Sequence, residues 1–227
     1  MRKPEITVTR IEPIQAGSLL LVRVHTSEGI TGLGEMHPAS VTSGGRYTGN
    51  GFIQFIAEYL VGKDPTEIER HWQHMFRRSL FRGGADAMAA ISAVDMALWD
   101  ITGKLAGLPV YKLLGGPVRE KVKLFATPTA YDDWTPERVG ENAVQLVEQG
   151  FRVLRIYPLG PREPFADFGF RQVARISEKY VAALRKAVGD EIDIAIDVIC
   201  LLSPAEAIET GRLLEPYGMI FFEDPIE

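Results

Sequence analysis

The chain has 227 residues, with 25 Lys and Arg against 30 Asp and Glu, which gives a formal net charge of −5 at pH 7. A mildly acidic chain of ordinary composition gives no reason to expect nucleic acid or an acidic membrane surface as a partner. No apolar run approaches membrane-spanning length, and the N-terminus, MRKPEITVTR, lacks the apolar core of a signal peptide. One cysteine, Cys200, excludes an intrachain disulfide. We therefore expect a cytoplasmic protein with no membrane partner.

The chain opens with the pattern of an antiparallel meander. Residues 5–37 are rich in β-prone side chains, and apolar and polar positions alternate within them. Gly32 and Gly34 interrupt the returning strand and indicate either a bulge or a close approach of another backbone. A loop rich in Ser, Thr, Gly and Asn is predicted from His37 to Gly51.

Three helices are predicted after this loop. The first two run from Phe52 to Val61 and from Pro65 to Phe81, and Asp64 is the expected N-cap of the second. The third, Ala85–Leu105, carries apolar residues at steps of three and four, which is typical of an amphipathic helix. Its many alanines allow another element to approach it closely.

Strands and helices alternate beyond Gly115-Gly116-Pro117, which we interpret as a domain boundary. Strands are predicted at residues 122–125, 153–157, 192–196 and 219–222, with helices between them that begin near Thr135, Phe170 and Ser203. Such alternation is typical of a parallel sheet, and an open doubly wound sheet and part of a βα barrel both fit it. No glycine-rich phosphate fingerprint follows these strands, so a dinucleotide-binding fold has no support.

Two of the predicted strands end on acidic residues, Asp197 and Glu223. Parallel strands joined by a helix have their C-terminal ends on the same side of the sheet, so these two residues are expected to be neighbours. Neighbouring carboxylates repel unless a cation lies between them, and a hard divalent cation such as Mg²⁺ takes oxygen ligands. The alternative is a helix-capping role, which Asp224 before Pro225 fits well. The helix after Asp197 has a better cap in Ser203, with Pro204 at its first position and Glu206 completing a capping box.

Several motifs resemble those of one family. The chain carries the sequences Arg82-Gly-Gly-Ala85, Ile91-Ser-Ala-Val-Asp-Met-Ala-Leu-Trp-Asp100, Gly107-Leu-Pro-Val-Tyr-Lys-Leu-Leu-Gly-Gly116, Leu214-Glu-Pro-Tyr217 and Phe222-Glu-Asp-Pro225. The first three resemble the mandelate racemase and muconate lactonizing enzyme branch of the enolase superfamily, and the last two resemble its acid-sugar dehydratases. The resemblance covers essentially the whole chain. It implies an α+β capping domain, residues 1–116, followed by an incomplete (β/α) barrel, residues 117–227, with about four of eight strands.

The resemblance also implies a metal site. In that family, acidic residues at the ends of the third, fourth and fifth barrel strands hold Mg²⁺. The metal binds a substrate carboxylate and stabilises the enediolate that forms when a base removes the α-proton. Such developing negative charge needs strong electrostatic stabilisation, which a divalent cation supplies. Asp197 and Glu223 match the first two ligand positions.

The second barrel strand departs from the family's pattern. Where relatives carry a lysine-containing motif, this chain has Arg155-Ile156-Tyr157. Arg155 stays protonated and suits a carboxylate or an oxyanion, whereas Tyr157 could act as acid or base only if its phenol ionised far below its ordinary range. Both could instead simply line the barrel mouth. Ile199 stands where some dehydratases carry a histidine, which argues against a mannonate-dehydratase-like activity that uses that histidine.

We therefore predict an enolase-superfamily lyase that uses Mg²⁺ to abstract a proton α to a carboxylate, with dehydration of a sugar acid as the reaction. Arg155 and Tyr157 are the candidate catalytic residues. A racemase or cycloisomerase of the same branch is the alternative, although racemisation needs two opposed bases and the second strand offers no lysine. We further expect the chain to be the N-terminal half of a parent enzyme, inactive by itself, which is a homo-oligomer at full length. The rival is a non-catalytic truncated chain, or a subunit that assembles with a complementary half.

Overall fold

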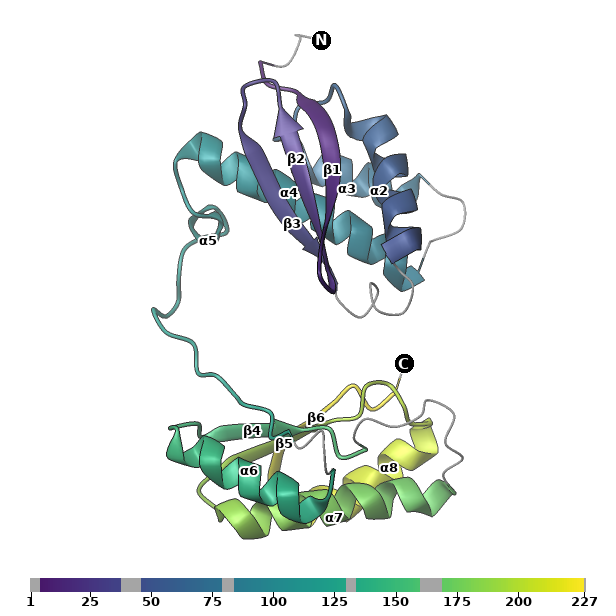
Figure 1. The fold of residues 1–227 in the computed structure, drawn as a ribbon, viewed down its shortest axis with the longest axis vertical. Helices are drawn as coiled ribbons and strands as arrows, with labels where there is room; N and C mark the ends of the chain where they lie inside the picture. Colours follow the sequence, from purple (N-terminus) through teal and green to yellow (C-terminus); the bar gives the residue numbers. More distant parts are fainter. Residues whose placement is uncertain (1–4, 38–45, 79–83, 130–133, 160–168, 227) are drawn as a thin grey trace. The chain divides into compact units, whose positions relative to one another are not determined.

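The computed structural model describes residues 5–37, 46–78, 84–129, 134–159 and 169–226. The chain divides into two compact units, residues 1–120 and 121–227, and each combines a three-stranded sheet with helices (Figure 1). The sequence-based boundary after Gly116 falls in the segment that follows the last helix of the first unit. Within the described ranges, no helix has the length and apolar character needed to cross a bilayer.

The N-terminal unit begins with the predicted meander. Its strands are β1 (Val8–Ala16), β2 (Leu19–Thr26) and β3 (Thr31–Met36), which pair antiparallel in the order β1-β2-β3. Alternate residues of the central strand, among them Val22 and Val24, are fully buried on the face that the helices cover. The alternation of apolar and polar residues in the sequence therefore sets which face of the sheet is the core.

Helices cover one face of this sheet (Figure 1). They are α2 (Arg46–Leu60), α3 (Ile68–Arg77) and α4 (Gly84–Ala106). The short α5 (Val110–Leu113) follows α4 and contributes no buried residue. The predicted third helix is confirmed as α4. The prediction of a loop as far as Gly51 is wrong, because α2 already begins at Arg46. Residues 38–45 and 79–83, on which parts of the predicted loop and second helix fall, lie outside the described residues.

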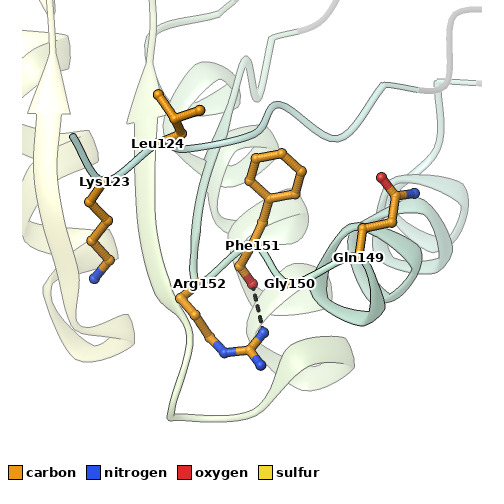
Figure 2. A pocket seen from close by; sticks show the side chains of 6 residues that line it. All are labelled: Lys123, Leu124, Gln149, Gly150, Phe151 and Arg152. Carbon is orange, nitrogen blue, oxygen red and sulfur yellow. Dashed lines mark hydrogen bonds between the residues drawn. The ribbon is translucent and has the colours of Figure 1, made fainter. Parts of the chain in front are cut away.

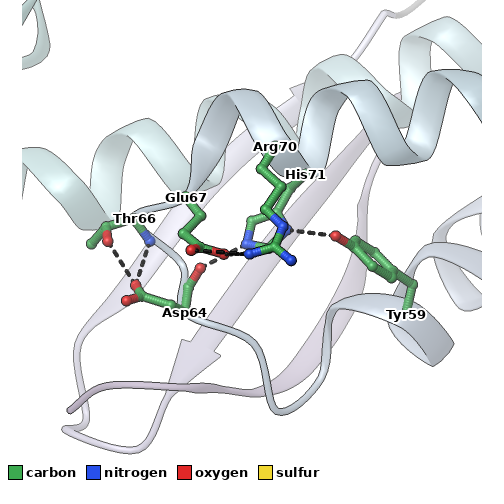
Figure 3. Close-up of polar contacts among 6 residues, drawn as sticks. All are labelled: Tyr59, Asp64, Thr66, Glu67, Arg70 and His71. Carbon is green, nitrogen blue, oxygen red and sulfur yellow. Dashed lines mark hydrogen bonds and ion pairs between the residues drawn. The ribbon is translucent and has the colours of Figure 1, made fainter. Parts of the chain in front are cut away.

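The start of α3 is set by a turn and not by the predicted N-cap (Figure 3). The Asp64 carboxylate accepts hydrogen bonds from the Thr66 N–H at 2.9 Å and from the Thr66 hydroxyl at 2.7 Å. The Asp64 carbonyl oxygen lies 2.6 Å from Nε2 of the buried His71, whose Nδ1 lies 3.0 Å from the Tyr59 hydroxyl. Because His71 ties this turn to the end of α2, the helix begins only at Ile68.

Strand β3 lies directly against α4, and its glycines make this contact possible. A Cβ atom added to Gly34 would overlap the backbone carbonyl oxygen of Ala93, and one added to Gly32 would overlap that of Ala97. The pairing of β2 with β3 runs without a register shift, so the glycines mark a close approach and not a bulge. Glycine on the strand and alanine on the helix together bring the two backbones into contact.

The C-terminal unit is a parallel sheet with helices along one face (Figure 1). Its strands are β4 (Val153–Ile156), β5 (Asp193–Asp197) and β6 (Met219–Glu223), in the order β4-β5-β6. Its helices are α6 (Pro136–Glu148), α7 (Phe170–Val188) and α8 (Pro204–Leu214), and the 3₁₀ turn η2 (Glu215–Tyr217) follows α8. This is the strand–helix alternation that the sequence predicts, and it places the strand ends on one side.

Alternate residues of these strands face the helices. Leu154, Ile156, Ile194 and Ile196 have no exposed surface and pack in one cluster with residues of α6 and α7. Successive side chains of a strand point to opposite faces, so the residues between them face away from the helices. The sheet therefore presents Arg155 and the other odd-numbered positions of β4 and β5 on the side where a barrel has its interior.

Two local predictions in this unit have opposite outcomes. The capping box of α8 is confirmed, because Ser203 Oγ accepts from the Glu206 N–H while the Glu206 carboxylate accepts from the Ser203 N–H at 2.9 Å. The predicted strand at residues 122–125 is wrong. Only the next residue, Ala126, forms an isolated parallel bridge, with Leu154 of β4. The side chains of Val122 and Leu124 are 72% and 67% exposed, so no packing supports the β-prone sequence there.

Candidate active site

Two carboxylates meet at the C-terminal edge of the parallel sheet. Asp197 is the last residue of β5, Glu223 is the last residue of β6, and the two are paired in the register of the strands. A register shift between Ile194 and Ala195 precedes this pair. The sequence predicts the two residues as neighbours, and the structure places them directly side by side.

The cation between the two carboxylates is the guanidinium of Arg155. Its Nη1 donates to both Oε1 and Oε2 of Glu223 at 2.8 Å and lies 3.2 Å from Oδ2 of Asp197. Its Nη2 donates to the hydroxyl of Tyr157. The side chains of Arg155 and Asp197 are 15% and 9% exposed, whereas that of Glu223 is 33% exposed. The predicted catalytic and metal-binding residues thus form one cluster, in which Arg155 is hydrogen-bonded to Glu223 and Tyr157 and ion-paired with Asp197.

Aromatic rings flank the same guanidinium. The Arg155 guanidinium carbon lies 4.7 Å from the ring centre of Phe125 and 5.0 Å from that of Tyr157. Both distances are within the range of cation–π attraction. Its buried Nε has no hydrogen-bond partner among the described residues. Phe125 carries no sequence signal of a site residue, because it belongs to a segment that has the pattern of an ordinary strand.

Burial and charge act against each other within the cluster. Burial raises the pKa of Asp197, and the nearby charges of Glu223 and Asp224 raise it further, against the Ile199 N–H and Arg155, which lower it. For Arg155, burial alone lowers the pKa, but the hydrogen bond to Glu223 and the surrounding negative charges outweigh it and raise the pKa overall. Arg155 therefore stays protonated, and its single positive charge is shared between the carboxylates of Asp197 and Glu223.

Strained loops follow both acidic strand ends. Ile199, Cys200 and Asp224 have positive φ angles of 50°, 56° and 42°, which non-glycine residues rarely adopt. Backbone hydrogen bonds join the two loops, including one of 2.7 Å from the Cys200 N–H to the Asp224 carbonyl oxygen. The Ile199 N–H also donates to Asp197 Oδ1 at 2.9 Å. These contacts fix the loops that hold the carboxylates.

The cluster offers the oxygen donors that a divalent cation prefers, but it supplies only two carboxylates, those of Asp197 and Glu223. Mg²⁺ prefers carboxylate oxygens and is commonly held by one or two carboxylates with waters. Asp197 and Glu223 supply such oxygens from adjacent strands, and the contact of both with Arg155 shows that the pair is stabilised by positive charge. Within the part of the chain that the structure describes, no group of three or more His, Cys, Asp and Glu residues could surround an ion. The metal-ligand roles stay predictions.

A separate pocket lies at the other end of β4 and contains none of the predicted site residues (Figure 2). It is lined by Lys123, Leu124, Gln149, Gly150, Phe151 and Arg152. The Nη1 of Arg152 donates to the carbonyl oxygens of Val147 and Phe151 at 3.1 and 3.0 Å. Arg152 thus donates to backbone carbonyl oxygens at the N-terminal end of β4, while Arg155 contacts the two carboxylates near the C-terminal end of β4.

An α+β unit followed by parallel βα units, with carboxylates at successive strand ends, defines the architecture of the enolase superfamily. Residues 2–115 match the N-terminal domain of the mandelate racemase / muconate lactonizing enzyme family, and residues 138–227 match the enolase C-terminal domain-like family. The chain belongs to the mandelate racemase / muconate lactonizing enzyme family. It comprises an α+β capping domain and an incomplete (β/α) barrel.

Its relatives include sugar-acid dehydratases. The chain is 34% identical to a D-gluconate dehydratase from Thermoproteus tenax, over 97% of this chain and 45% of the relative. It is 32% identical to a D-galactonate dehydratase from Pectobacterium atrosepticum, over 100% of this chain and 56% of the relative. A crystal structure of an enolase from Pantoea ananatis with bound D-gluconate and Mg matches 98% of this chain and 60% of that one, with a TM-score of 0.81 and 27% identity. The chain spans about half the length of the curated relatives it matches.

Proposed function

We propose that this chain supplies the cap and the first part of the barrel of an enzyme that uses Mg²⁺ to remove a proton α to a carboxylate, in the dehydration of a sugar acid. The observation that carries the proposal is the register pair Asp197 and Glu223, with Arg155 between them. The curated relatives from Thermoproteus tenax and Pectobacterium atrosepticum are dehydratases, which favours dehydration as the reaction.

Each residue of the cluster has a role in this proposal. Asp197 and Glu223 hold the metal, which when bound supplies positive charge to a substrate carboxylate and to its enediolate form. Arg155 binds a negatively charged group of the sugar acid, because a guanidinium matches the geometry of a carboxylate. Tyr157, whose hydroxyl accepts a hydrogen bond from Arg155 Nη2, is the candidate acid or base.

Metal binding by residues 1–227 tests the proposal without requiring turnover. We expect the chain to bind Mn²⁺, used in place of Mg²⁺, with loss of the signal of free aqueous Mn²⁺ in electron paramagnetic resonance. Asp197→Asn and Glu223→Gln should each weaken binding by about tenfold or more, because each removes one of the two charged ligands. Glu191→Gln is the matched control, since this exposed residue precedes β5 and lies at the opposite end of the strand. Equal binding by all four proteins would refute the proposal.

The same material tests the substrate class. Calorimetric titration with D-gluconate should show binding in the presence of saturating Mg²⁺ and none in its absence, because the metal would supply the positive charge that attracts the substrate carboxylate. D-galactonate is the second ligand to titrate, and glucose, which lacks the carboxylate, is the control. If D-gluconate bound equally well with and without Mg²⁺, its binding would not depend on a metal held by Asp197 and Glu223.

We expect the 227-residue chain by itself not to turn over these acids. Strand β6 pairs only with β5 in the described residues, and its Ile220 and Phe221 side chains are 48% and 39% exposed. An open edge of this kind leaves backbone groups unpaired and apolar side chains uncovered. An assay of D-gluconate and D-galactonate with Mg²⁺, together with the mass of the protein in solution, checks this expectation. Turnover by a monomeric chain at an ordinary enzymatic rate would contradict it.

A further inference from the structure

The Arg155 guanidinium occupies the place from which both carboxylates can be reached. A single nitrogen, Nη1, lies 2.8 Å from both oxygens of Glu223 and 3.2 Å from Oδ2 of Asp197. An ion bound to these oxygens would sit about 2.1 Å from them. Such an ion would therefore lie close to Nη1, at a separation where two cations repel strongly. The arginine and a divalent cation therefore compete for the same carboxylate oxygens.

The same side chain has a second set of contacts. Its Nη2 donates to the Tyr157 hydroxyl, and its guanidinium lies against the rings of Phe125 and Tyr157. These contacts do not involve either carboxylate. Aromatic faces attract a guanidinium without fixing it in one orientation, so Arg155 can turn away from the carboxylates while it keeps its aromatic neighbours. Its partly exposed partner Glu223 makes the exchange accessible from solvent.

We propose that Arg155 is a built-in counter-cation that occupies the metal position in the metal-free protein and is displaced when a divalent cation binds. The displaced guanidinium stays over Phe125 and Tyr157 and takes a carboxylate group of the substrate. This inference rests on the proposed function and deepens it, since it concerns how the same site is filled.

The exchange couples metal binding to binding of the acid. Without the metal, the Arg155 guanidinium is ion-paired with Asp197 and Glu223 and cannot also pair with a substrate carboxylate. Metal binding releases it, so each ligand favours the other, and by linkage the coupling is equal in both directions. The internal ion pair also lowers the apparent affinity for the metal, because the metal must displace it. We therefore expect the metal to bind before the sugar acid.

The first measurement compares Mn²⁺ affinity in wild type and Arg155→Met. Methionine has similar length and no charge, so the variant should bind Mn²⁺ about tenfold more tightly, within the range usual for coupled sites. Arg152→Met is the matched control, because it removes the same charge from the other end of β4 (Figure 2) and should change the affinity by less than about twofold in physiological salt. A role of Arg155 in packing alone would not tighten metal binding.

The second measurement uses the wild-type chain and does not depend on the folding of a variant. The Nε–H signal of Arg155, assigned by its absence from the spectrum of Arg155→Lys, should shift in nuclear magnetic resonance as Mg²⁺ saturates the site. The Arg152 signal should stay in place. Addition of D-gluconate after Mg²⁺ should shift the Arg155 signal again, whereas D-gluconate alone should not.

The outcomes separate this inference from the proposed function. If wild type binds Mn²⁺ through Asp197 and Glu223 but Arg155→Met binds it equally or more weakly, the counter-cation role is refuted and the proposed function stands. An Arg155 signal that does not shift at saturating Mg²⁺ also refutes the counter-cation role alone. If neither wild type nor Arg155→Met binds a divalent cation, both proposals fail.

Discussion

Replacement of Gly34 by alanine is expected to destabilise the N-terminal unit by roughly 3 kcal/mol or more, the upper end of the usual cost of overpacking. The new Cβ would overlap the carbonyl oxygen of Ala93 and lie only 2.8 Å from its carbonyl carbon. Both atoms belong to the backbone of α4, so no side-chain rotation can relieve the conflict. Either β3 or α4 must move, and that movement opens a core in which Ala93 and Val94 have no exposed surface.

Urea denaturation followed by tryptophan fluorescence measures this effect, since Trp72 and Trp99 lie on α3 and α4 of this unit. A Trp134→Phe background removes the signal of the other unit. Gly51→Ala is the matched control. It introduces the same methyl group into α2, where no atom lies within 4 Å, and should stabilise the helix by about 0.5–1 kcal/mol. Unchanged stability of Gly34→Ala would show that the backbones of β3 and α4 are not in direct contact at this position.

The second large effect is expected from Arg155→Met on the stability of the metal-free C-terminal unit. Removal of the guanidinium leaves Asp197 and Glu223 side by side with no cation between them. Breaking a fully buried pair costs about 3–5 kcal/mol, and the one-third exposure of Glu223 reduces that cost through solvent screening. We therefore expect a loss of roughly 2 kcal/mol in the free energy of unfolding at neutral pH. Fluorescence of Trp134, near Tyr180 of α7, follows this unit.

Two rescues identify repulsion as the cause of that loss. Addition of Glu223→Gln to Arg155→Met removes one of the two charges and should restore part of the lost stability. Saturating Mg²⁺ should stabilise Arg155→Met more than wild type, because a ligand that binds only the folded state adds more stability the more tightly it binds. If Arg155→Met remains destabilised in the double variant and in Mg²⁺, the arginine acts through packing and not through its charge.

The carboxylate pair shows what local sequence can establish. An apolar run that ends on an acidic residue, a capped helix and a second such run are all local signals. Parallel pairing then requires both strand ends to lie on one side of the sheet. The capping box of Ser203 is equally local, because its partner Glu206 is three positions away. Gly32 and Gly34 by themselves are compatible with a bulge or a close approach, and only the contact of β3 with α4 decides between the two.

Other features were decided by contacts between distant residues. The helix α3 begins late because His71 binds the Asp64 carbonyl oxygen and Tyr59, which no local signal indicates. Residues 122–125 have strand-forming side chains, yet they form no strand because only Ala126 pairs with β4.

The position of Arg155 belongs to the same class. The sequence by itself determined that this residue and the two acidic residues stand at the ends of neighbouring strands, because alternation along a strand and the parallel order of strands follow from backbone geometry. Only the tertiary structure decided that the guanidinium lies between the carboxylates. Arg155 is separated from Glu223 by 68 positions in the chain. Which charged groups share one buried space depends on how strands and side chains pack, and the local pattern does not contain that information.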